Sequence, residues 1–313
     1  DTAKLAVDGL LSLARQHGHP KVRIRFFGGE PMRDWKVYQS IIRYASAQTN
    51  GPEVEFYLNT NGSIMSPTIA EFLKQYRVKT IVSIDGIGQV NDQFRTYPGG
   101  LGTFKQVKKG VLVLKQAGVT LHINITLHRA NIDHLLEVVD FAKQMGAEDV
   151  GLEELCFIED SSSNFSTDKE TEARKVLEAW RYGRQIGMPV LGSWSGFRDS
   201  PQFHGSLHYC AGNGEEICVD HNGLVFTCFG LPVSIGHVSD LQSCFRHPMY
   251  EAMALRLVGN IPACEGCEIE GPCGGNCAAD IFAVKRDINA VDEAKCEFRR
   301  TIARTLLLEW AKA

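Results

Sequence analysis

The stretch "CEGCEIEGPCGGNC", Cys264 to Cys277, places four cysteines within fourteen residues at the spacing C-x2-C-x5-C-x3-C. Nine of the ten cysteines in the chain follow residue 209. Thiolates at such short spacings can wrap one metal centre, because each neighbouring pair closes a small chelate loop. The glycines between them let the backbone turn and bring amide N–H groups close to bound sulfur. The stretch therefore predicts a metal site, either zinc or iron–sulfur, and the chain has more thiols than one zinc ion needs.

The overall composition narrows the class of protein. The 313 residues are 44% hydrophobic and 22% charged, which is typical of a globular chain, and the formal net charge of −4 does not favour nucleic-acid binding. No apolar run is long enough to span a membrane, and Asp8 and Arg15 interrupt the apolar residues near the N-terminus, unlike in a signal peptide. We therefore expect a cytoplasmic protein with neither nucleic-acid nor membrane partners. Its cysteines are expected to serve metal binding or catalysis rather than disulfides.

Short β-type runs alternate with helical periodicity from residue 22 to about 190. This alternation predicts an α/β fold with a parallel sheet. One more strand upstream of this chain would make six, which suits an open, partial (β/α)6 barrel that lacks its first strand here. The predicted strands cover 22–27, 53–59, 79–85, 120–127 and 148–155, and the predicted helices lie near 35–48, 66–75, 103–117, 132–145 and 168–187.

Three of the predicted strands end in polar or glycine-rich clusters. These are "GGEP" (28–31), "NTNG" (59–62) and "SIDG" (83–86). Because the carboxyl ends of parallel strands meet at one edge of a sheet, and ligands bind there in such folds, the three clusters predict a binding site.

The sequence changes character after about residue 205, where Cys, Gly, Pro and His become frequent. A hairpin is predicted over 216–220 and 224–228, and a final helix over 292–311. We therefore predict two domains, a partial barrel over 1–195 and a small cysteine-rich domain over 205–313. The chain begins within an amphipathic helix, so a segment upstream of it is expected to be missing.

The order C210-x12-G223-x4-C228, C264-x2-C267-x5-C273-x3-C277 and C296 resembles the seven-cysteine signature of the SPASM extension of radical S-adenosylmethionine (SAM) enzymes. The three strand-end clusters are similar to the SAM-binding barrel of the same superfamily. The resemblance covers nearly the whole chain and implies two auxiliary [4Fe–4S] clusters. The first cysteine set implied by it is Cys210, Cys228 and Cys277, with Cys218 as the fourth member. The second cysteine set is Cys264, Cys267, Cys273 and Cys296. Cys156 and Cys244 lie outside both sets and are expected to be ordinary buried thiols.

The resemblance also implies residues that hold SAM. The "GGE" backbone carbonyls and the Glu30 carboxylate would accept from the SAM ammonium, and Arg95 offers forked donors suited to its carboxylate. Asp85 would either line the substrate cavity or hold the following loop through an Asx turn. The implied SAM-binding residues are Gly28, Gly29, Glu30, Asn61, Ser83 and Arg95.

A third cluster is needed for reductive cleavage of SAM, and the family builds it from C-x3-C-x2-C. The 313 residues contain no such motif. This SAM-binding [4Fe–4S] cluster is therefore expected on a missing N-terminal segment, and these residues alone are expected not to cleave SAM. The other explanation is a degenerate relative without catalysis.

The resemblance implies hydrogen abstraction by a 5′-deoxyadenosyl radical. We expect a peptide maturase that forms a thioether or carbon–carbon crosslink in a ribosomal precursor peptide, with flavodoxin or ferredoxin as electron donor. The alternatives are a sulfatase-maturing enzyme, a small-molecule radical SAM dehydrogenase, and a metal-binding module without catalysis. Phe229 stands where the sulfatase-maturing type carries an aspartate base, which disfavours that alternative.

Overall fold

The computed structural model describes residues 2–48, 51–156, 165, 167–192, 194 and 207–312. The chain forms two compact units. Unit 1 comprises Asp1–Ala6, Leu155–Leu177 and Ser193–Ala313, and unit 2 comprises Val7–Glu154 and Glu178–Gly192. The two domains predicted from the sequence remain a prediction.

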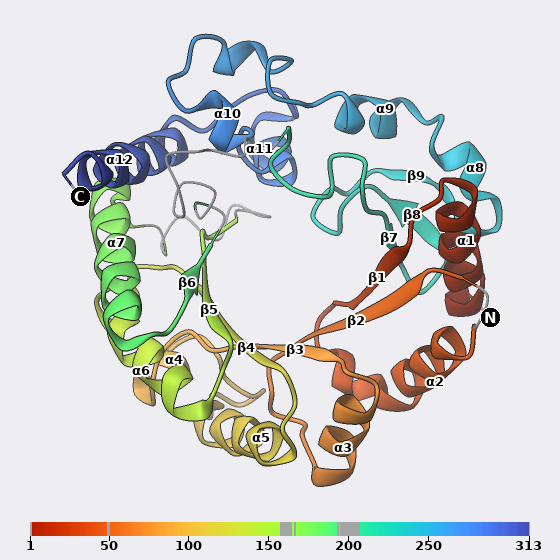
Figure 1. Cartoon of the computed structure of the whole chain (residues 1–313), viewed down its shortest axis with the longest axis horizontal. Helices are drawn as coiled ribbons and strands as arrows, with labels where there is room; N and C mark the ends of the chain where they lie inside the picture. The colour runs from red at the N-terminus through yellow and green to blue at the C-terminus, as the bar shows by residue number, and fades with distance from the viewer. Residues whose placement is uncertain are drawn as a thin grey trace. The chain divides into compact units, whose positions relative to one another are not determined.

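Unit 2 contains a six-stranded sheet in which every neighbouring pair is parallel (Figure 1). The strands follow one another in chain order, as expected when helices connect them by crossovers of one hand. This confirms the predicted α/β class. The strands are β1 (Lys21–Phe26), β2 (Glu53–Thr60), β3 (Lys79–Ser83), β4 (Leu121–Thr126), β5 (Asp149–Glu153) and β6 (Val190–Leu191).

The chain itself contains a sixth strand that the sequence did not predict, at the edge of the sheet beside β5, and the strand expected upstream of the chain remains a prediction. Five strands were predicted within the chain and the sixth upstream of it, whereas Val190 and Leu191 pair with Val150 and Gly151 of β5. Two residues are too few to show a period of two, so the pattern carried no signal for this strand.

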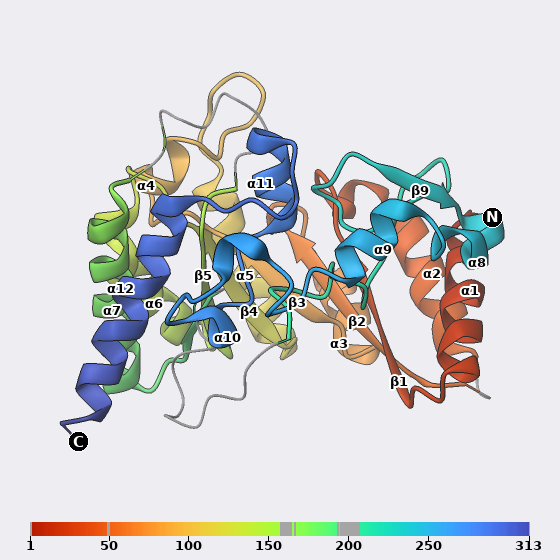
Figure 2. The ribbon, with the colours of Figure 1, turned by 90° about the horizontal axis from the view of Figure 1, so that it is seen from above.

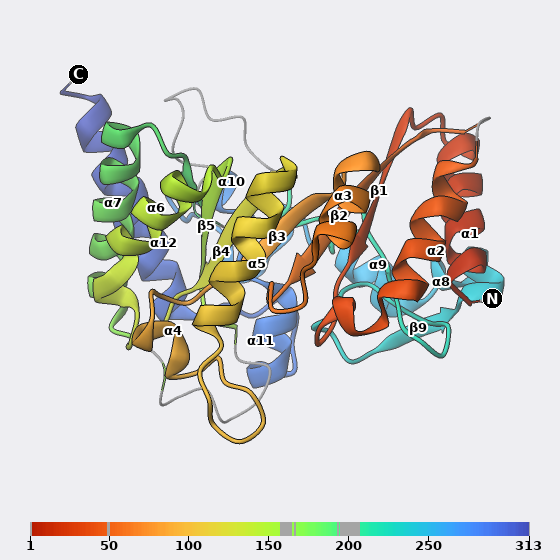
Figure 3. The same cartoon turned by 90° about the horizontal axis from the view of Figure 1, so that it is seen from below.

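Helices lie between the strands along the chain. Ser66 begins α3 by accepting from the Ile69 amide at 3.3 Å, and Pro67 occupies the first helical position, where its missing N–H costs nothing. Figures 1 and 3 show α2, α3, α5 and α6 on one face of the sheet. The helices are α1 (Thr2–Gln16), α2 (Trp35–Ser46), α3 (Pro67–Gln75), α4 (Gln89–Asp92), α5 (Phe104–Ala117), α6 (Leu135–Met145) and α7 (Lys169–Ile186).

The two faces of the sheet differ in chemistry. Along β2 to β5, buried side chains alternate with half-buried ones, which is the period expected of a strand with one covered face. In β4 the buried positions are Leu121, Ile123 and Ile125, whereas His122 and Asn124 lie on the other face. The second face is therefore polar enough for a hydrated ligand to approach it.

Unit 1 combines short strands and short helices with one long helix, α12 (Glu293–Trp310), near the C-terminus (Figure 2). The predicted hairpin is present as an antiparallel pair, and a third strand, which the sequence did not predict, extends it. In the part of the chain that the structure describes, no helix is both long and apolar enough to cross a lipid bilayer. The elements are β7 (Cys218–Val219), β8 (Leu224–Phe226), β9 (Ser234–His237), α8 (Leu241–Cys244), α9 (Pro248–Ala254), α10 (Glu270–Cys273), α11 (Ala278–Lys285) and α12 (Glu293–Trp310).

A substitution at Gly110 tests how closely α5 packs against the end of β2. A Cβ at this buried position would lie 2.0 Å from the carbonyl oxygen of Gly62, so the backbone would have to move. We expect Gly110→Ala to lower the free energy of unfolding by roughly 1–3 kcal/mol, the usual cost of overpacking. Lys109→Ala, at an exposed position of the same helix, should change it by less than about 0.5 kcal/mol in the same urea titration. Equal stabilities for both variants would contradict this contact.

Candidate functional site

The carboxyl ends of four neighbouring strands in unit 2 bring most of the predicted SAM-binding residues to one edge. β1 leads into Gly28 to Glu30, β2 into Asn61, and β3 ends at Ser83. The strands are parallel and adjacent, so these residues lie at the same edge of the sheet. His128, which follows β4, joins them at this edge.

The Glu30 carboxylate ties the end of β1 to the end of β2. Its Oε1 accepts from the Met32 amide at 2.9 Å and from the Thr60 hydroxyl at 2.7 Å, and its Oε2 accepts from the Asn61 amide at 2.6 Å. The Asn61 side chain in turn accepts from the Ser63 amide at 2.9 Å. Glu30 is thus a positioning residue in this structure, and its contact with a SAM ammonium stays a prediction.

Gly28 and Gly29 border open space beside Glu30. A Cβ added at either residue would meet no other atom within 4 Å, and both residues are exposed. Their backbone carbonyls can therefore be approached by a ligand without obstruction from a side chain. This open backbone fits the role that the family resemblance implies for binding the SAM ammonium.

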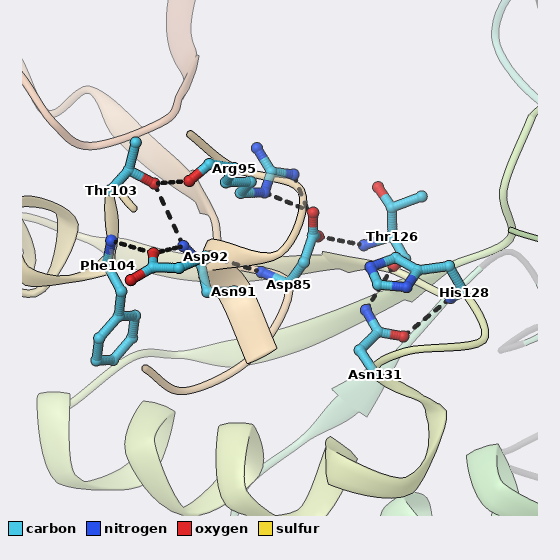
Figure 4. Close-up of polar contacts among 9 residues, drawn as sticks. All are labelled: Asp85, Asn91, Asp92, Arg95, Thr103, Phe104, Thr126, His128 and Asn131. Carbon is cyan, nitrogen blue, oxygen red and sulfur yellow. Dashed lines mark hydrogen bonds and ion pairs between the residues drawn. The ribbon is translucent and has the colours of Figure 1, made fainter. Parts of the chain in front are cut away.

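Asp85 and Arg95 form a forked ion pair after β3 (Figure 4). Arg95 donates from Nε to Asp85 Oδ2 at 2.6 Å and from Nη2 to Asp85 Oδ1 at 3.1 Å. Asp85 is 6% exposed and also accepts from the Thr126 amide at 3.1 Å. Asp85 therefore holds the following loop, but through Arg95 rather than through an Asx turn. The roles of Ser83 and Arg95 in binding SAM remain predictions, and two of the guanidinium nitrogens of Arg95 already donate to Asp85.

A network of polar side chains holds the loop that carries Arg95 (Figure 4). Asn91, which is fully buried, accepts from the Asp85 amide at 3.2 Å and donates to Thr103 Oγ1 at 3.3 Å. Thr103 donates to the Arg95 carbonyl at 2.8 Å, and Asp92 accepts from the Phe104 amide at 2.8 Å. The position of Arg95 is therefore fixed from both ends of its loop.

His128 is a site residue that the sequence reasoning missed. Its ring is packed edge-on against Phe94, 4.7 Å between centroids, and its Nδ1 accepts from the Ala130 amide at 3.2 Å. Its buried Nε2 has no hydrogen-bond partner among the described residues. Burial lowers the pKa of His128 and the charge of Asp85 opposes that shift. A neutral ring that offers one N–H donor fits this site, and the only available signal was its place just after a predicted strand.

The second cysteine set lines a single pocket in unit 1. With its opening to solvent included, the pocket has a volume of about 290 Å³. Burial raises the pKa of Cys296 to about 11. The lining residues are Cys264, Cys267, Ile269, Glu270, Cys273, Gly275, Asn276, Cys296 and Arg300.

The first cysteine set also gathers within unit 1. Burial is the largest cause that raises the pKa of Cys210 and of Cys228. Cys277 and Cys228 raise the pKa of Cys210 further, and Cys277 and Cys218 raise that of Cys228, so the four thiols are electrostatic neighbours. Backbone amides approach their sulfurs: Gly230 donates to Cys228 Sγ at 3.4 Å, and Ala279 donates to Cys277 at the start of α11. Amide donors at thiolates are typical of iron–sulfur sites.

The donor chemistry of both cysteine sets fits a cluster. All ten cysteines are free thiols. Among the described residues, no group of three or more Cys, His, Asp or Glu side chains converges on one point that a single metal ion would fill. Four thiols around an open pocket, as in the second cysteine set, instead suit a group with several metal atoms and its own sulfides.

The two cysteines outside the sets differ from each other. Cys244 is fully buried, as predicted, and its Sγ contacts the Asp240 carbonyl at 3.4 Å. The prediction for Cys156 was wrong, because this residue is exposed. Its thiol donates a hydrogen bond to Cys277, which lowers the pKa of Cys277. The contact joins residues far apart in the sequence, so no local pattern indicated it.

The part of the chain that contains most of the sheet edge is similar to a known protein family. Residues 3–142 match the model of the Radical SAM superfamily. The chain is 26% identical to the "Radical SAM cyclopropyl synthase TigE" of Paramaledivibacter caminithermalis over 92% of its own length and 60% of that protein. It is also 26% identical to an "AdoMet-dependent heme synthase" of Methanosarcina barkeri, over 96% of its own length and 87% of that protein. The chain therefore spans less than two thirds of the TigE sequence.

The fold is similar to that of a solved structure, anSMEcpe with bound AdoMet and the Cp18Cys peptide. The TM-score is 0.79 at 16% identity, and the match covers 98% of this chain and 89% of that one. The similarity supports an open, partial barrel as the architecture around the six-stranded sheet.

Glu30→Gln tests the tie between β1 and β2. The new amide group would have to face either the Asn61 amide or the Met32 and Thr60 donors, so at least one buried hydrogen bond is lost. We expect a loss of roughly 1–3 kcal/mol in the free energy of unfolding, measured by denaturant titration. Glu53→Gln, at an exposed position of β2, is the matched control and should be nearly neutral. A neutral Glu30→Gln would show that the carboxylate does not join the two strands.

The double variant Cys264→Ala/Cys267→Ala tests the second cysteine set. After anaerobic reconstitution, the unmodified chain should hold about eight iron and eight sulfide per molecule, and the double variant about half of that. Cys244→Ala, which removes a buried thiol outside both sets, should bind as much iron as the unmodified chain. Zinc in place of iron, or an equal loss in the control, would contradict the assignment.

Proposed function

We propose that this chain, whose residues 3–142 match the model of the Radical SAM superfamily, is the catalytic part of a SPASM-type peptide maturase. The observation that carries the proposal is the gathering of eight thiols into two sets within unit 1, one of them around a single pocket. The product would be a thioether or carbon–carbon crosslink in a precursor peptide. The peptide bound in the anSMEcpe structure supports a peptide as the class of substrate.

The chain's own residues would bind and orient the reactants. When bound, SAM and the iron–sulfur clusters supply hydrogen abstraction and electron acceptance. Gly28 and Gly29 would present backbone carbonyls to the SAM ammonium, in a loop that Glu30 holds against β2. Arg95, fixed by Asp85, and the Nε2 donor of His128 would orient anionic or carbonyl groups at the same edge. Flavodoxin or ferredoxin would supply electrons.

Two other enzymatic functions compete with this proposal. The haem synthase relative, which the chain covers over 87% of its length, supports a small-molecule substrate. A sulfatase-maturing activity would need a proton acceptor next to Cys228, and the residue there is Phe229, whose side chain is exposed and cannot take a proton. The TigE relative carries out cyclopropyl synthesis by its name, a carbon–carbon bond formation, and supports the crosslinking proposal.

The activity test uses the full-length gene product, loaded with clusters under anaerobic conditions, with SAM and a low-potential reductant. Each short peptide encoded beside the gene is the probe, followed by mass spectrometry. We expect release of 5′-deoxyadenosine and a peptide lighter by two hydrogen atoms that does not react with a hydrazine. Residues 1–313 alone, which contain no C-x3-C-x2-C, are the matched control and should release none.

The other outcomes would contradict peptide crosslinking in distinct ways. A hydrazine-reactive aldehyde in the peptide, or in the Cp18Cys peptide used as a second probe, would indicate sulfatase maturation. Conversion of a porphyrin precursor with every peptide unchanged would indicate the small-molecule function. Iron-loaded protein that never cleaves SAM would leave only the metal-binding module.

A further inference from the structure

Arg256 is buried in unit 1 with most of its guanidinium unpartnered. The side chain is 1% exposed. Its Nε donates to the Ile288 carbonyl at 2.6 Å, whereas Nη1 and Nη2 have no hydrogen-bond partner among the described residues. Burying a cation with open donors is costly, because neither water nor a counter-charge replaces its hydration. Such a group therefore points to a ligand that accepts hydrogen bonds and carries negative charge.

The groups around Arg256 come from both cysteine sets. Cys264 and Cys273 of the second set and Cys277 and Cys210 of the first set all act electrostatically on the guanidinium, and they raise its pKa while burial lowers it. This single cation is therefore near the ligands of two separate sites.

Gly275 leaves room for the guanidinium beside the second cysteine set. Its φ is +84°, and a Cβ there would lie 3.2 Å from Arg256 Nη2 and 2.7 Å from Ile261 Cδ1. Gly275 itself lines the pocket of the second set. The unpartnered Nη groups consequently pack directly against a residue of the pocket wall.

The loop that carries Cys210 holds the backbone of Arg256. Asn213, which is buried, donates from Nδ2 to the Arg256 carbonyl at 3.0 Å and to the Met253 carbonyl at 3.2 Å. The Asn213 amide donates to the Cys210 carbonyl at 3.1 Å. The position of Arg256 is therefore coupled to a ligand of the first set through one intervening side chain.

Two other arginines, Arg299 and Arg300, contact cysteines of the second set. Arg300 lines the pocket of that set, and a hydrogen bond with Cys267 raises the pKa of Arg300. Arg299 approaches Cys273 Sγ from Nη1 at 3.9 Å. Arg256 differs from Arg300, on which only Cys267 and Cys296 of the second set are seen to act, because thiols of both sets act on Arg256.

We propose that Arg256 is a positioning residue shared by the two cluster sites, whose Nη1 and Nη2 groups donate to sulfur atoms at both and whose charge raises both reduction potentials. The proposal rests on the proposed function, since it requires iron–sulfur clusters in the two sets. Hydrogen bonds to sulfur and nearby positive charge favour the reduced, more negative form of a cluster.

The test compares Arg256→Met, Arg256→Lys and Arg304→Gln with the unmodified chain. Arg256→Met removes the charge and the donors but keeps the length of the side chain, and Arg256→Lys keeps the charge. Arg304→Gln removes an exposed arginine of the same unit that pairs with Glu268 at 2.7 Å, and serves as the matched control. The readouts are iron and sulfide content, the midpoint potential of each cluster from a redox titration followed by electron paramagnetic resonance, and the melting temperature without iron.

We expect Arg256→Met to shift the one-electron reduction equilibrium of both clusters at least tenfold toward the oxidised form, which is about 59 mV in midpoint potential. It should also speed the loss of iron to a chelator severalfold. Arg256→Lys should keep both potentials close to those of the unmodified chain, and Arg304→Gln should change neither. Without iron, Arg256→Met should melt at the same temperature as the unmodified chain or higher, because it removes a buried cation whose Nη1 and Nη2 have no hydrogen-bond partner among the described residues.

Three results would overturn the inference and leave the proposed function standing: unchanged potentials in Arg256→Met, a shift in only one of the two clusters, or the same shift in Arg256→Lys as in Arg256→Met. Should Arg256→Met fail to hold clusters, equal failure of Arg256→Lys would overturn the role of charge, and retention by Arg256→Lys would support it. An unmodified chain that binds no iron would instead overturn the proposed function and this inference together.

Discussion

The Glu30 carboxylate joins the ends of two parallel strands, and the arrangement of the sheet edge depends on it. Strands in a parallel sheet do not meet through a turn, so their ends need a separate connection. Glu30 provides it by accepting from the Met32 amide on its own loop and from the Thr60 hydroxyl and Asn61 amide at the end of β2. Further along, the Asp85 carboxylate holds Arg95 and the Thr126 amide in the same manner. Two carboxylates thus order the loops at the edge of the sheet that carries the candidate SAM site.

Unit 1 has a different basis for stability. Its described strands are two to four residues long, and two of its apolar clusters contain five and three buried residues, each packed against cysteines of one set. Small apolar cores of this kind supply little burial energy, and natural domains with such cores commonly add metal ligation. The buried pair of Asp280 and Lys295 is weak evidence for added stability, because two charges must be desolvated to form it. The metal binding by the thiols that we propose would add to the stability of this unit.

The sequence predicted the elements and residues whose signals are local. The five long strands, the hairpin and the final helix follow from periodicity and turn residues, and the strand-end motifs follow from their position after those strands. Contacts between distant segments carried no such signal: Asp85 with Arg95 across a loop, Cys156 with Cys277, and Arg256 among the cysteines. Arg256 in particular stands in "ALRLVG", where a cation near the end of a short helix is normally solvated. Burial of that charge is decided by loops that come together only in the folded unit.

The candidate SAM site in unit 2 and the two cysteine sets in unit 1 differ in how many of their polar groups already have hydrogen-bond partners. At the sheet edge, the carboxylates of Glu30 and Asp85 already have partners, so binding there would need little rearrangement. Around the thiols, Arg256 Nη1 and Nη2 and Asn276 Nδ2 are buried and have no hydrogen-bond partner in the part of the chain that the structure describes, and burial raises the pKa of Cys228 to about 11. Metal binding deprotonates thiols and supplies acceptors for such donors in one step. Binding of the clusters would therefore also stabilise the folded state of unit 1. The bound clusters would supply hydrogen-bond acceptors for the buried donors of Arg256 and Asn276.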